Sequence, residues 1–410
     1  MRPLSTRLAA YLAFGMLVAS CGGGTGGSAA TPGVVGDTIV VGALVPLSDP
    51  VAVIGRPILR ATQVYFAQRN AAGGLGGRYQ VKVLEEDITY ANPSTSVQKY
   101  QKIKDQVATF ASIVGTDHIN GVLPLLQEDR IIATPVTLDA EWVRNPTLLS
   151  VWAPYQIESL NGVGYFLGQP GNAGKTVCSM VLATGYGEAA EEGVVHAAAE
   201  MGFAVGVSVR FRQDDQDFVA PITQLRSAGC EAVMLASLPA VTGKVLGAAA
   251  QTGFAPRWIL TFPSWHGTLA ASALADYMAR TTWVMGEGPL WGDTTDVTMR
   301  QMMEAVATYA PDQTPDTYFA AGWSAAVSTA ALLEQAIASG DLSREGLLTA
   351  LETLGTVTAW SDYQYGPIAT REPPRSNTIF RIDPQGPFGM GIEARNVSVP
   401  AAASYQFRTP

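Results

Sequence analysis

An uninterrupted apolar run near the start is the feature that most constrains how this 410-residue chain can fold. Residues 39–45 read Ile-Val-Val-Gly-Ala-Leu-Val, which predicts a strand buried on both faces, the usual situation in a parallel sheet. Pro46 ends the strand because proline has no N–H for a neighbouring strand. A loop from Leu47 to Gly55 follows, and we expect a helix to open near Pro57. This order places the loop at the carboxyl edge of a sheet, where open α/β sheets bind ligands, and makes Ser48 a candidate ligand contact.

The same alternation of strand and helix recurs along the chain. Further strands are predicted at 80–86, 111–115, 131–133, 176–183, 203–211, 231–236, 258–262 and 282–285. Helices are predicted at 93–110, 120–129, 187–201, 218–228, 240–252, 268–279, 298–309, 318–339 and 344–354, and hairpin material ends the chain. Gly202, Gly229 and Gly253 suit the ends of three of these helices. We therefore predict an α/β fold with two doubly wound parallel-sheet lobes, one sheet before about Ala153 and one after it.

Composition places the chain among globular proteins and argues against nucleic acid as a partner. The hydrophobic fraction is 47% and the charged fraction 15%, so the chain can bury sizeable cores. The net charge of −9 becomes −11 when Arg2 and Arg7 are removed with the first twenty residues. An acidic chain without a cluster of lysine and arginine does not fit a nucleic-acid binder.

Residues 1–20 have the form of a targeting segment. Arg2 and Arg7 provide a basic start, and the apolar stretch 8–19 is too short to span a bilayer. The segment runs into Val-Ala-Ser-Cys21, which resembles the lipobox of lipoproteins, where the cysteine becomes the acylated first residue. Residues 21–36, rich in glycine, would then form a flexible tether that holds the body off a membrane. The alternative is an ordinary signal peptide with an incidental cysteine.

Two further cysteines, Cys178 and Cys230, lie in or next to strands that we expect to be neighbours. An exported location permits a disulfide between them. Strand neighbours often point to unsuitable faces, however, so two buried free thiols are the alternative.

Motifs for catalysis and for metal binding are missing from the sequence. It contains three histidines, His118, His196 and His266, and no His-x-x-x-His or Cys-x-x-Cys pair that would support a zinc site. It has no Gly-x-Ser-x-Gly nucleophile elbow and no phosphate-binding Gly-x-x-x-x-Gly-Lys-Ser/Thr. We therefore expect neither an enzyme nor a bound cofactor.

The opening unit also resembles a known family. The stretch VGALVPLSDP…GRPILRATQVYFAQRNAAGGLGGRYQVKVLEED is similar to the start of bacterial branched-chain amino-acid-binding proteins, which are type I periplasmic solute-binding proteins of ABC importers. The resemblance extends, with gaps, over roughly the whole mature chain. It implies two lobes with a ligand cleft between them, and a chain that crosses between the lobes three times.

With those crossings placed near 152–155, 286–292 and 366–377, the resemblance implies the division into lobes. The N-terminal lobe would comprise 37–153 and 289–366, and the C-terminal lobe 154–288 and 367–400. Residues 401–410 would be a tail.

The resemblance and the strand ends together suggest the ligand contacts. After the predicted strands come Thr116 and His118, then Val136 and Thr137, Tyr186, Ser237 and Leu238, and finally Ser264 and Trp265. His118 is equally well explained as a surface histidine, and Trp265 as a tryptophan packed on its lobe. Tyr186 lies between two glycines, where we expect little core for it to join, so replacing it with alanine should weaken ligand affinity with little effect on stability.

One departure from the family bears on the ligand. Branched-chain amino-acid binders place a glutamate about where Ser264 lies, and that glutamate pairs with the ligand ammonium. An ammonium buried without a counter-charge costs several kcal/mol, so an α-amino acid is in doubt unless Asp117 replaces the glutamate.

These observations predict a membrane-tethered solute-binding lipoprotein, monomeric, that delivers a small ligand to ABC permease subunits. The ligand would be amino-acid-like, an amide, or an aromatic or aliphatic acid. Two alternatives stay open: a ligand-sensing extracellular receptor component, and an exported α/β enzyme on a similar scaffold.

Overall fold

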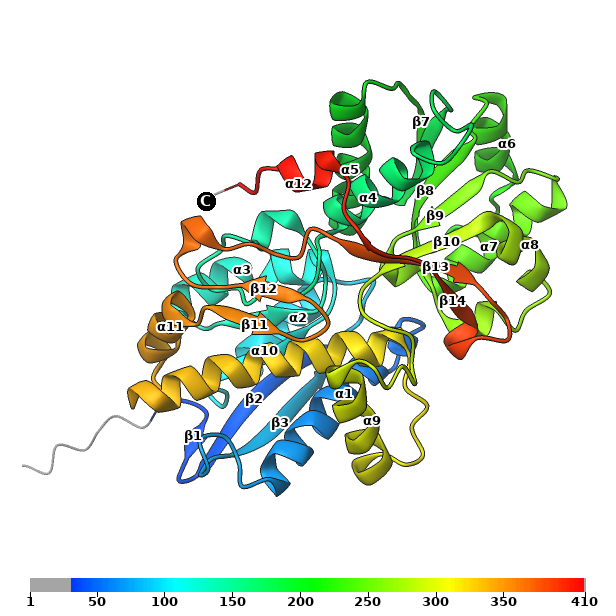
Figure 1. Ribbon diagram of the computed structural model, residues 1–410. Coiled ribbons are helices and arrows are strands. Elements are labelled where there is room, and N and C mark those ends of the chain that lie inside the picture. Colours follow the sequence, from blue (N-terminus) through cyan, green and yellow to red (C-terminus); the bar gives the residue numbers. More distant parts are fainter. Residues whose placement is uncertain (1–30, 409–410) are drawn as a thin grey trace, which may run out of the picture. The chain divides into compact units, whose positions relative to one another are not determined.

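Two separate sheets, each with helices on both faces, organise the protein (Figure 1). The structure is a computed structural model and describes residues 31–408, so the expected signal peptide, Cys21 and the tether up to residue 30 lie outside it. The two-lobed α/β architecture that the alternation of elements predicts is confirmed.

The first sheet has four parallel strands and a short antiparallel one. Its parallel order is β3 (Gln80–Asp87), β2 (Thr38–Val45), β4 (Thr109–Ile113) and β5 (Ala133–Pro135), with β1 (Val34–Val35) antiparallel to β2. One face packs against α1 (Ala52–Ala71), α9 (Val297–Tyr309), α10 (Thr317–Ser339) and α11 (Arg344–Thr353). The other face packs against α2 (Ser94–Ile103) and α3 (Thr116–Asp129). Because β2 lies between β3 and β4, its apolar residues are buried from both sides, as the sequence predicts.

The second sheet has five parallel strands and an antiparallel hairpin. Its order is β7 (Val205–Phe211), β6 (Val177–Leu182), β8 (Ala232–Ala236), β9 (Arg257–Leu260), β10 (Thr282–Gly286), β13 (Asn377–Ile382) and β14 (Met390–Val397). The last two strands run antiparallel, so the C-terminal hairpin joins this sheet beside β10. The covering helices are α4 (Tyr155–Leu167), α5 (Gly185–Met201), α6 (Val219–Ser227), α7 (Pro239–Gln251), α8 (Ala275–Thr281) and α12 (Pro400–Ser404).

The chain passes between the two sheets through three segments. Leu149 still bonds to Ala133 beside the first sheet, and α4 of the second begins at Tyr155. The chain returns between Gly286, which ends β10, and Val297, which begins α9. It crosses again between the small hairpin β11 (Thr356–Thr358) and β12 (Asp362–Gln364) and strand β13. We call these passages the hinge segments, 150–154, 287–296 and 365–376.

The first helix starts five residues earlier than predicted, at Ala52, and Pro57 lies inside it. Asp49 explains the early start, because its side chain accepts a hydrogen bond from the Val51 N–H and its carbonyl accepts one from Ala52. The helix also packs tightly on the end of β2. A side chain at Gly55 would place its Cβ 2.0 Å from the Pro46 carbonyl oxygen, so only glycine fits there.

Both predicted flexible ends contain folded residues. Residues 31–36, expected in the tether, form a turn and β1, and Val40 donates to the Gly33 carbonyl. Residues 401–410 were expected to be a tail, but 400–404 form α12, and Tyr405 and Phe407 after it are buried. Arg375 donates to the Tyr405 carbonyl and Arg144 to the Phe407 carbonyl, which holds this segment against the body. Three other predicted helix boundaries were wrong. Helix α3 starts at 116 instead of 120, and the predicted helix 93–110 ends at 103. Helix α8 spans 275–281, where the sequence predicts 268–279.

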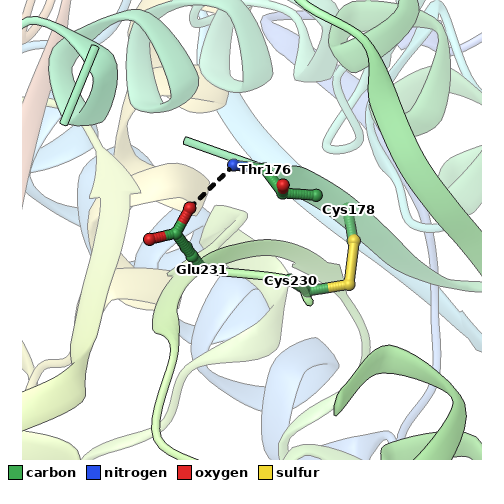
Figure 2. Close-up of a disulfide and its surroundings, with 4 residues drawn as sticks. All are labelled: Thr176, Cys178, Cys230 and Glu231. Atoms are coloured by element: carbon green, nitrogen blue, oxygen red, sulfur yellow. Dashed lines mark hydrogen bonds between the residues drawn. A yellow bond between two sulfur atoms is a disulfide. The ribbon is translucent and has the colours of Figure 1, made fainter. Parts of the chain in front are cut away.

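Cys178 and Cys230 form a disulfide in the second sheet (Figure 2). Cys178 is in β6, and Cys230 stands just before β8, the parallel neighbour of β6. Their Cα atoms are 5.7 Å apart, within the usual range for a disulfide. The Glu231 carboxylate accepts a hydrogen bond of 3.1 Å from the Thr176 N–H beside the disulfide, so the starts of the two strands are joined twice.

Reducing this disulfide should destabilise the protein. The bond closes a loop with a sequence separation of 52 residues, for which we expect a loss of about 2–4 kcal/mol of unfolding free energy. Urea unfolding with and without dithiothreitol measures the effect. The double variant Cys178→Ala/Cys230→Ala serves as control, because its midpoint should already be low and should not respond to the reductant.

Candidate functional site

The carboxyl ends of the two sheets face a narrow apolar pocket, which we call the inner pocket. The space between atoms in and around it is about 510 Å³, a figure that includes the solvent at its mouth. The first sheet and its helices contribute Ile54, Ile58, Tyr90, Val114, Gly115, Val136, Thr137, Leu138, Val151, Trp152, Tyr318 and Ala321. The second sheet contributes Tyr155, Tyr186, Leu238, Phe262 and Pro263. None of these described lining residues is charged, so the pocket suits an apolar body.

Tyr186 is fixed in the inner pocket by three groups of the second sheet. It stands in the first turn of α5, and its hydroxyl bonds with the hydroxyls of Thr261 and Ser264 and with the Ser237 carbonyl at 3.1 Å. Its side chain is buried, and its ring packs on Tyr155 at a centroid distance of 4.7 Å. The expectation that alanine here would leave stability unchanged is therefore wrong, because removing a buried aromatic ring costs about 3–5 kcal/mol.

A chain of three hydroxyls runs along the wall of the first sheet. Thr116 bonds Thr137 at 2.9 Å, and Thr137 bonds the Tyr155 hydroxyl at 3.1 Å. The two bonds use two of the three hydroxyl hydrogens. One hydrogen therefore remains on one of the three hydroxyls, where it could be donated to an acceptor on a ligand.

A wider and more polar space, the outer pocket, adjoins the inner one and shares Tyr90 and Tyr186 with it. Its empty space is about 1450 Å³, and its lining includes Thr116, Asp117, His118, Thr184, Arg212 and Asp214. Asp117, in the first turn of α3, accepts a hydrogen bond of 2.9 Å from the Gly185 N–H at the start of α5. Its carboxylate thus lies at a helix N-terminus on the opposite sheet, the favourable place for an anion.

His118 has a structural role in the wall between the pockets. Its ring nitrogens bond the Ser96 hydroxyl and, at 2.9 Å, the Tyr90 carbonyl. Burial lowers the pKa of His118 below its ordinary value, so the ring is neutral at pH 7. A neutral ring that donates from Nε2 to Tyr90 and accepts at Nδ1 from Ser96 holds the Tyr90 loop in place.

The predicted ligand contacts divide into two groups. Six line one of the two pockets: Thr116, His118, Val136, Thr137, Tyr186 and Leu238. Four lie outside both linings: Ser48, Ser237, Ser264 and Trp265. Ser48 is exposed, Trp265 is packed in the core, and Ser264 and Ser237 support Tyr186 from behind.

Sequence reasoning missed most of the aromatic lining. Tyr90, Trp152, Tyr155, Phe262 and Tyr318 all contact the inner pocket. Two signals could have found four of them. Phe262 ends the predicted strand 258–262 and Tyr90 stands four residues after the predicted strand 80–86, while Trp152 and Tyr155 lie in a predicted crossing. Tyr318 is the first residue of the predicted helix 318–339, and its hydroxyl donates across to the carbonyls of Pro263, at 3.0 Å, and Trp265.

Glu287 joins two of the three hinge segments and the small hairpin formed by β11 and β12. Its carboxyl group accepts hydrogen bonds from the Ala153 N–H in the first hinge segment and from the Ser361 hydroxyl at 3.0 Å beside β12. Burial raises the pKa of Glu287 to about 7. Glu158 is a second buried carboxyl group, and it accepts a hydrogen bond of 3.1 Å from the Phe262 N–H. Burial raises the pKa of Glu158 well above its ordinary value, and the charge of Glu287 raises it further.

Neither a metal site nor a membrane span is found in the described part of the chain. Within residues 31–408, no three or more His, Cys, Asp or Glu side chains gather closely enough to hold a metal ion. No helix in that range combines the length and the apolarity that crossing a bilayer requires.

The fold is shared with known periplasmic binding proteins. Residues 38–386 match the family model described as periplasmic binding protein. A fatty acid ABC transporter substrate-binding protein from Thermomonospora curvata has a similar structure, with a TM-score of 0.85, 21% identity, and coverage of 92% of this chain and 97% of that one.

Two further solved structures are similar. A branched chain amino acid ABC transporter protein from Thermus thermophilus with bound valine has a TM-score of 0.77 and 15% identity, and covers 90% of this chain and 99% of that one. A possible leucine/isoleucine/valine-binding protein from Rhodopirellula baltica has a TM-score of 0.76 and 17% identity, and covers 90% and 98%. No curated protein sequence matches the chain.

Replacing Glu287 with glutamine should reduce the loss of stability between pH 5 and pH 7.5. A buried carboxyl group with a pKa raised from 4.5 to about 7 contributes stability below pH 4.5 and loses it as the pH rises through 7. The loss amounts to about 3 kcal/mol. Glutamine can accept from Ala153 and donate to Ser361, so it imitates the protonated form at every pH.

The measurement is the urea midpoint of the wild type and of Glu287→Gln across this pH range. Glu158 remains in both proteins, and because the charge of Glu287 also raises the Glu158 pKa, the difference between the two curves reports Glu287 together with this coupling. Parallel curves would show that Glu287 does not titrate in this range.

Proposed function

Because residues 38–386 match its model, the chain belongs to the periplasmic binding protein family, and we propose that it binds a small, mostly apolar carboxylic acid and passes it unchanged to an ABC permease. The single observation that carries the choice of ligand is the uncharged lining of the inner pocket. The body of the ligand would lie there, enclosed by aromatic and aliphatic side chains from both sheets.

The inner pocket is a poor site for a free α-amino acid. The ammonium group of such a ligand needs a carboxylate, and Ser264, where branched-chain amino-acid binders have one, is engaged with Tyr186 and Thr261. Asp117 is the carboxylate that could replace this glutamate, but it lines the outer pocket and accepts a hydrogen bond from the Gly185 N–H. A buried ammonium without a partner costs several kcal/mol, so an acid that lacks the amino group is favoured.

The carboxylate of the ligand would remain on the polar side. The hydroxyl chain of Thr116, Thr137 and Tyr155 leads from the outer pocket to the inner one and has a hydrogen to donate. Arg212, the basic residue in the lining of the outer pocket, bonds Asp214 of the same lining at 3.1 Å and would have to share its guanidinium group between Asp214 and the ligand. This arrangement agrees with the fatty acid named for the Thermomonospora protein, whose fold is similar.

Binding without chemistry also fits the state of the polar groups. The hydroxyls of Tyr186, Thr261 and Ser264 bond one another, and both nitrogens of His118 are engaged. A catalytic nucleophile bonds its base and must also reach the substrate, whereas Ser96, the hydroxyl that bonds His118, is buried and lines neither the inner nor the outer pocket. We therefore propose a carrier in place of an enzyme.

Membership of the family implies a location outside the cytoplasm. We further propose that Cys21 is acylated and that the glycine-rich residues after it hold the folded body at the membrane surface as a monomer. Closure of the two lobes on the ligand would present the surface that the permease recognises.

A thermal-shift and calorimetric comparison of octanoic acid with leucine tests the ligand class. Octanoic acid should raise the melting temperature and leucine should not. At a hundredfold excess over its dissociation constant, a ligand adds about 2.7 kcal/mol of stability. Stabilisation by leucine alone would contradict the proposal, as would a changed ligand recovered by mass spectrometry after release.

A pair of variants on α10 locates the site. Ala321→Leu adds volume to the inner pocket and should weaken octanoic acid binding about tenfold or more. Ala338→Leu makes the same change at an exposed position of the same helix and should leave binding unchanged. Equal affinities of the two variants would place the ligand elsewhere.

A further inference from the structure

A second enclosed apolar space, the rear pocket, lies behind the inner pocket. Its empty space is also about 510 Å³. It is lined by parts of β10, β13, β14, α9, α10 and a hinge segment, which can be followed in Figure 1. Its apolar lining includes Val284, Met285, Pro289, Leu290, Trp291, Met299, Met302, Ala320, Phe380, Phe388 and Met390.

Two aromatic side chains separate the rear pocket from the inner one. Trp152 and Phe262 line both spaces, and their rings pack edge to face with centroids 4.6 Å apart. Only this pair is shared between the two linings. The two apolar spaces therefore meet at one aromatic partition.

The backbone of the partition is strained. Trp152 has a φ of +64°, a left-handed conformation that bulky residues rarely adopt and that costs about 1–3 kcal/mol. A hydrogen bond of 2.9 Å from its indole N–H to the Ser324 hydroxyl on α10 helps to hold the ring in position. Strained residues of this kind gather at ligand clamps and at moving parts, and Trp152 lies in a hinge segment.

The rear pocket suits the flexible end of an apolar chain. Four methionines line it, Met285, Met299, Met302 and Met390, and methionine side chains adapt to ligands of different shape. Its two acidic residues are Glu287 and Asp316, whose pKa values burial raises to about 7 and about 6. The outer pocket also has two acids, but Asp117 and Asp214 are bonded there to the Gly185 N–H and to Arg212. The lining of the rear pocket includes no basic residue, so a carboxylate beside its two acids would be repelled once they ionise and a fatty acid would enter tail first.

We propose that the inner and rear pockets together bind one straight-chain aliphatic acid, and that the ring pair Trp152–Phe262 moves aside for chains that exceed the inner pocket. The inference rests on the proposed function, because it takes the same ligand class and extends it to long chains. The carboxylate stays at the outer pocket, the first part of the chain fills the inner pocket, and the distal methylenes lie among the methionines.

A chain-length series tests the inference. Calorimetric titration of the full chain with straight-chain acids from butanoic to hexadecanoic acid should show affinity that rises about fourfold per added methylene. The rise should continue beyond the length that fills the inner pocket. Affinity that stops rising at about octanoic acid would overturn the inference and leave the proposed function standing.

Neighbouring positions on α10 provide a matched pair of variants. Ala320 lines the rear pocket and Ala321 lines the inner pocket. Ala320→Leu should lower the ratio of dodecanoic to hexanoic acid affinity about tenfold, because only the longer chain reaches the rear pocket. Ala321→Leu should weaken both acids. An unchanged ratio in Ala320→Leu, with its melting temperature retained, would overturn the inference.

Trp152→Gly removes both the partition and the backbone strain, since glycine readily adopts a positive φ. It should speed the association of dodecanoic acid at least severalfold over that of hexanoic acid in stopped-flow fluorescence. Equal acceleration of the two acids would count against a partition. If no acid of any length binds the wild type, the proposed function itself fails, a result distinct from all of these.

Discussion

Hydrogen bonds among the side chains that form the inner pocket decide what a ligand can meet there. Tyrosine and threonine hydroxyls reach into an apolar space, and each unpaired one would cost about 1–3 kcal/mol. Tyr186 is therefore paired with Thr261 and Ser264, and Tyr155 with Thr137. Once these groups satisfy one another, the inner pocket offers a ligand mostly hydrocarbon and few polar hydrogens, among them the spare hydrogen of the Thr116–Thr137–Tyr155 hydroxyls. The chemistry of the ligand follows from that remainder.

Buried groups in the hinge segments are also held by hydrogen bonds. Glu287 accepts hydrogen bonds from Ala153 and Ser361, so one carboxyl group links the first two passages of the chain between the sheets and the β11–β12 hairpin. Trp152 stands in the neighbouring segment with a strained backbone and bonds α10 through Ser324. Burial, hydrogen bonding and strain thus coincide in the passages of the chain between the two sheets, beside the inner and rear pockets.

Sequence reasoning was sufficient for the fold and for the wall of the site that lies at strand ends. Apolar runs such as 39–45 and the glycines after helices have local physical causes, so β2 and the end of α5 were predicted well. Tyr318 and the methionines of the rear pocket could not be predicted, because their roles depend on packing between segments far apart in the chain. Helix starts failed where a single side chain decided them, as Asp49 does for α1. The consequence of burying Tyr186 was also missed, since periodicity does not reveal that Thr261 and Ser264 lie beside it.

The strand order of the second sheet has a consequence for how the protein can be made. Strand β10 pairs with β13, and roughly ninety residues that separate them belong mostly to helices packed on the first sheet. Helix α10, late in the chain, is in turn a principal partner of α1, near its start. Neither half can be completed from one continuous piece, so ribosomal synthesis must nearly finish before either core closes. Such interleaving favours translocation of an open chain and assembly of both halves together on the far side.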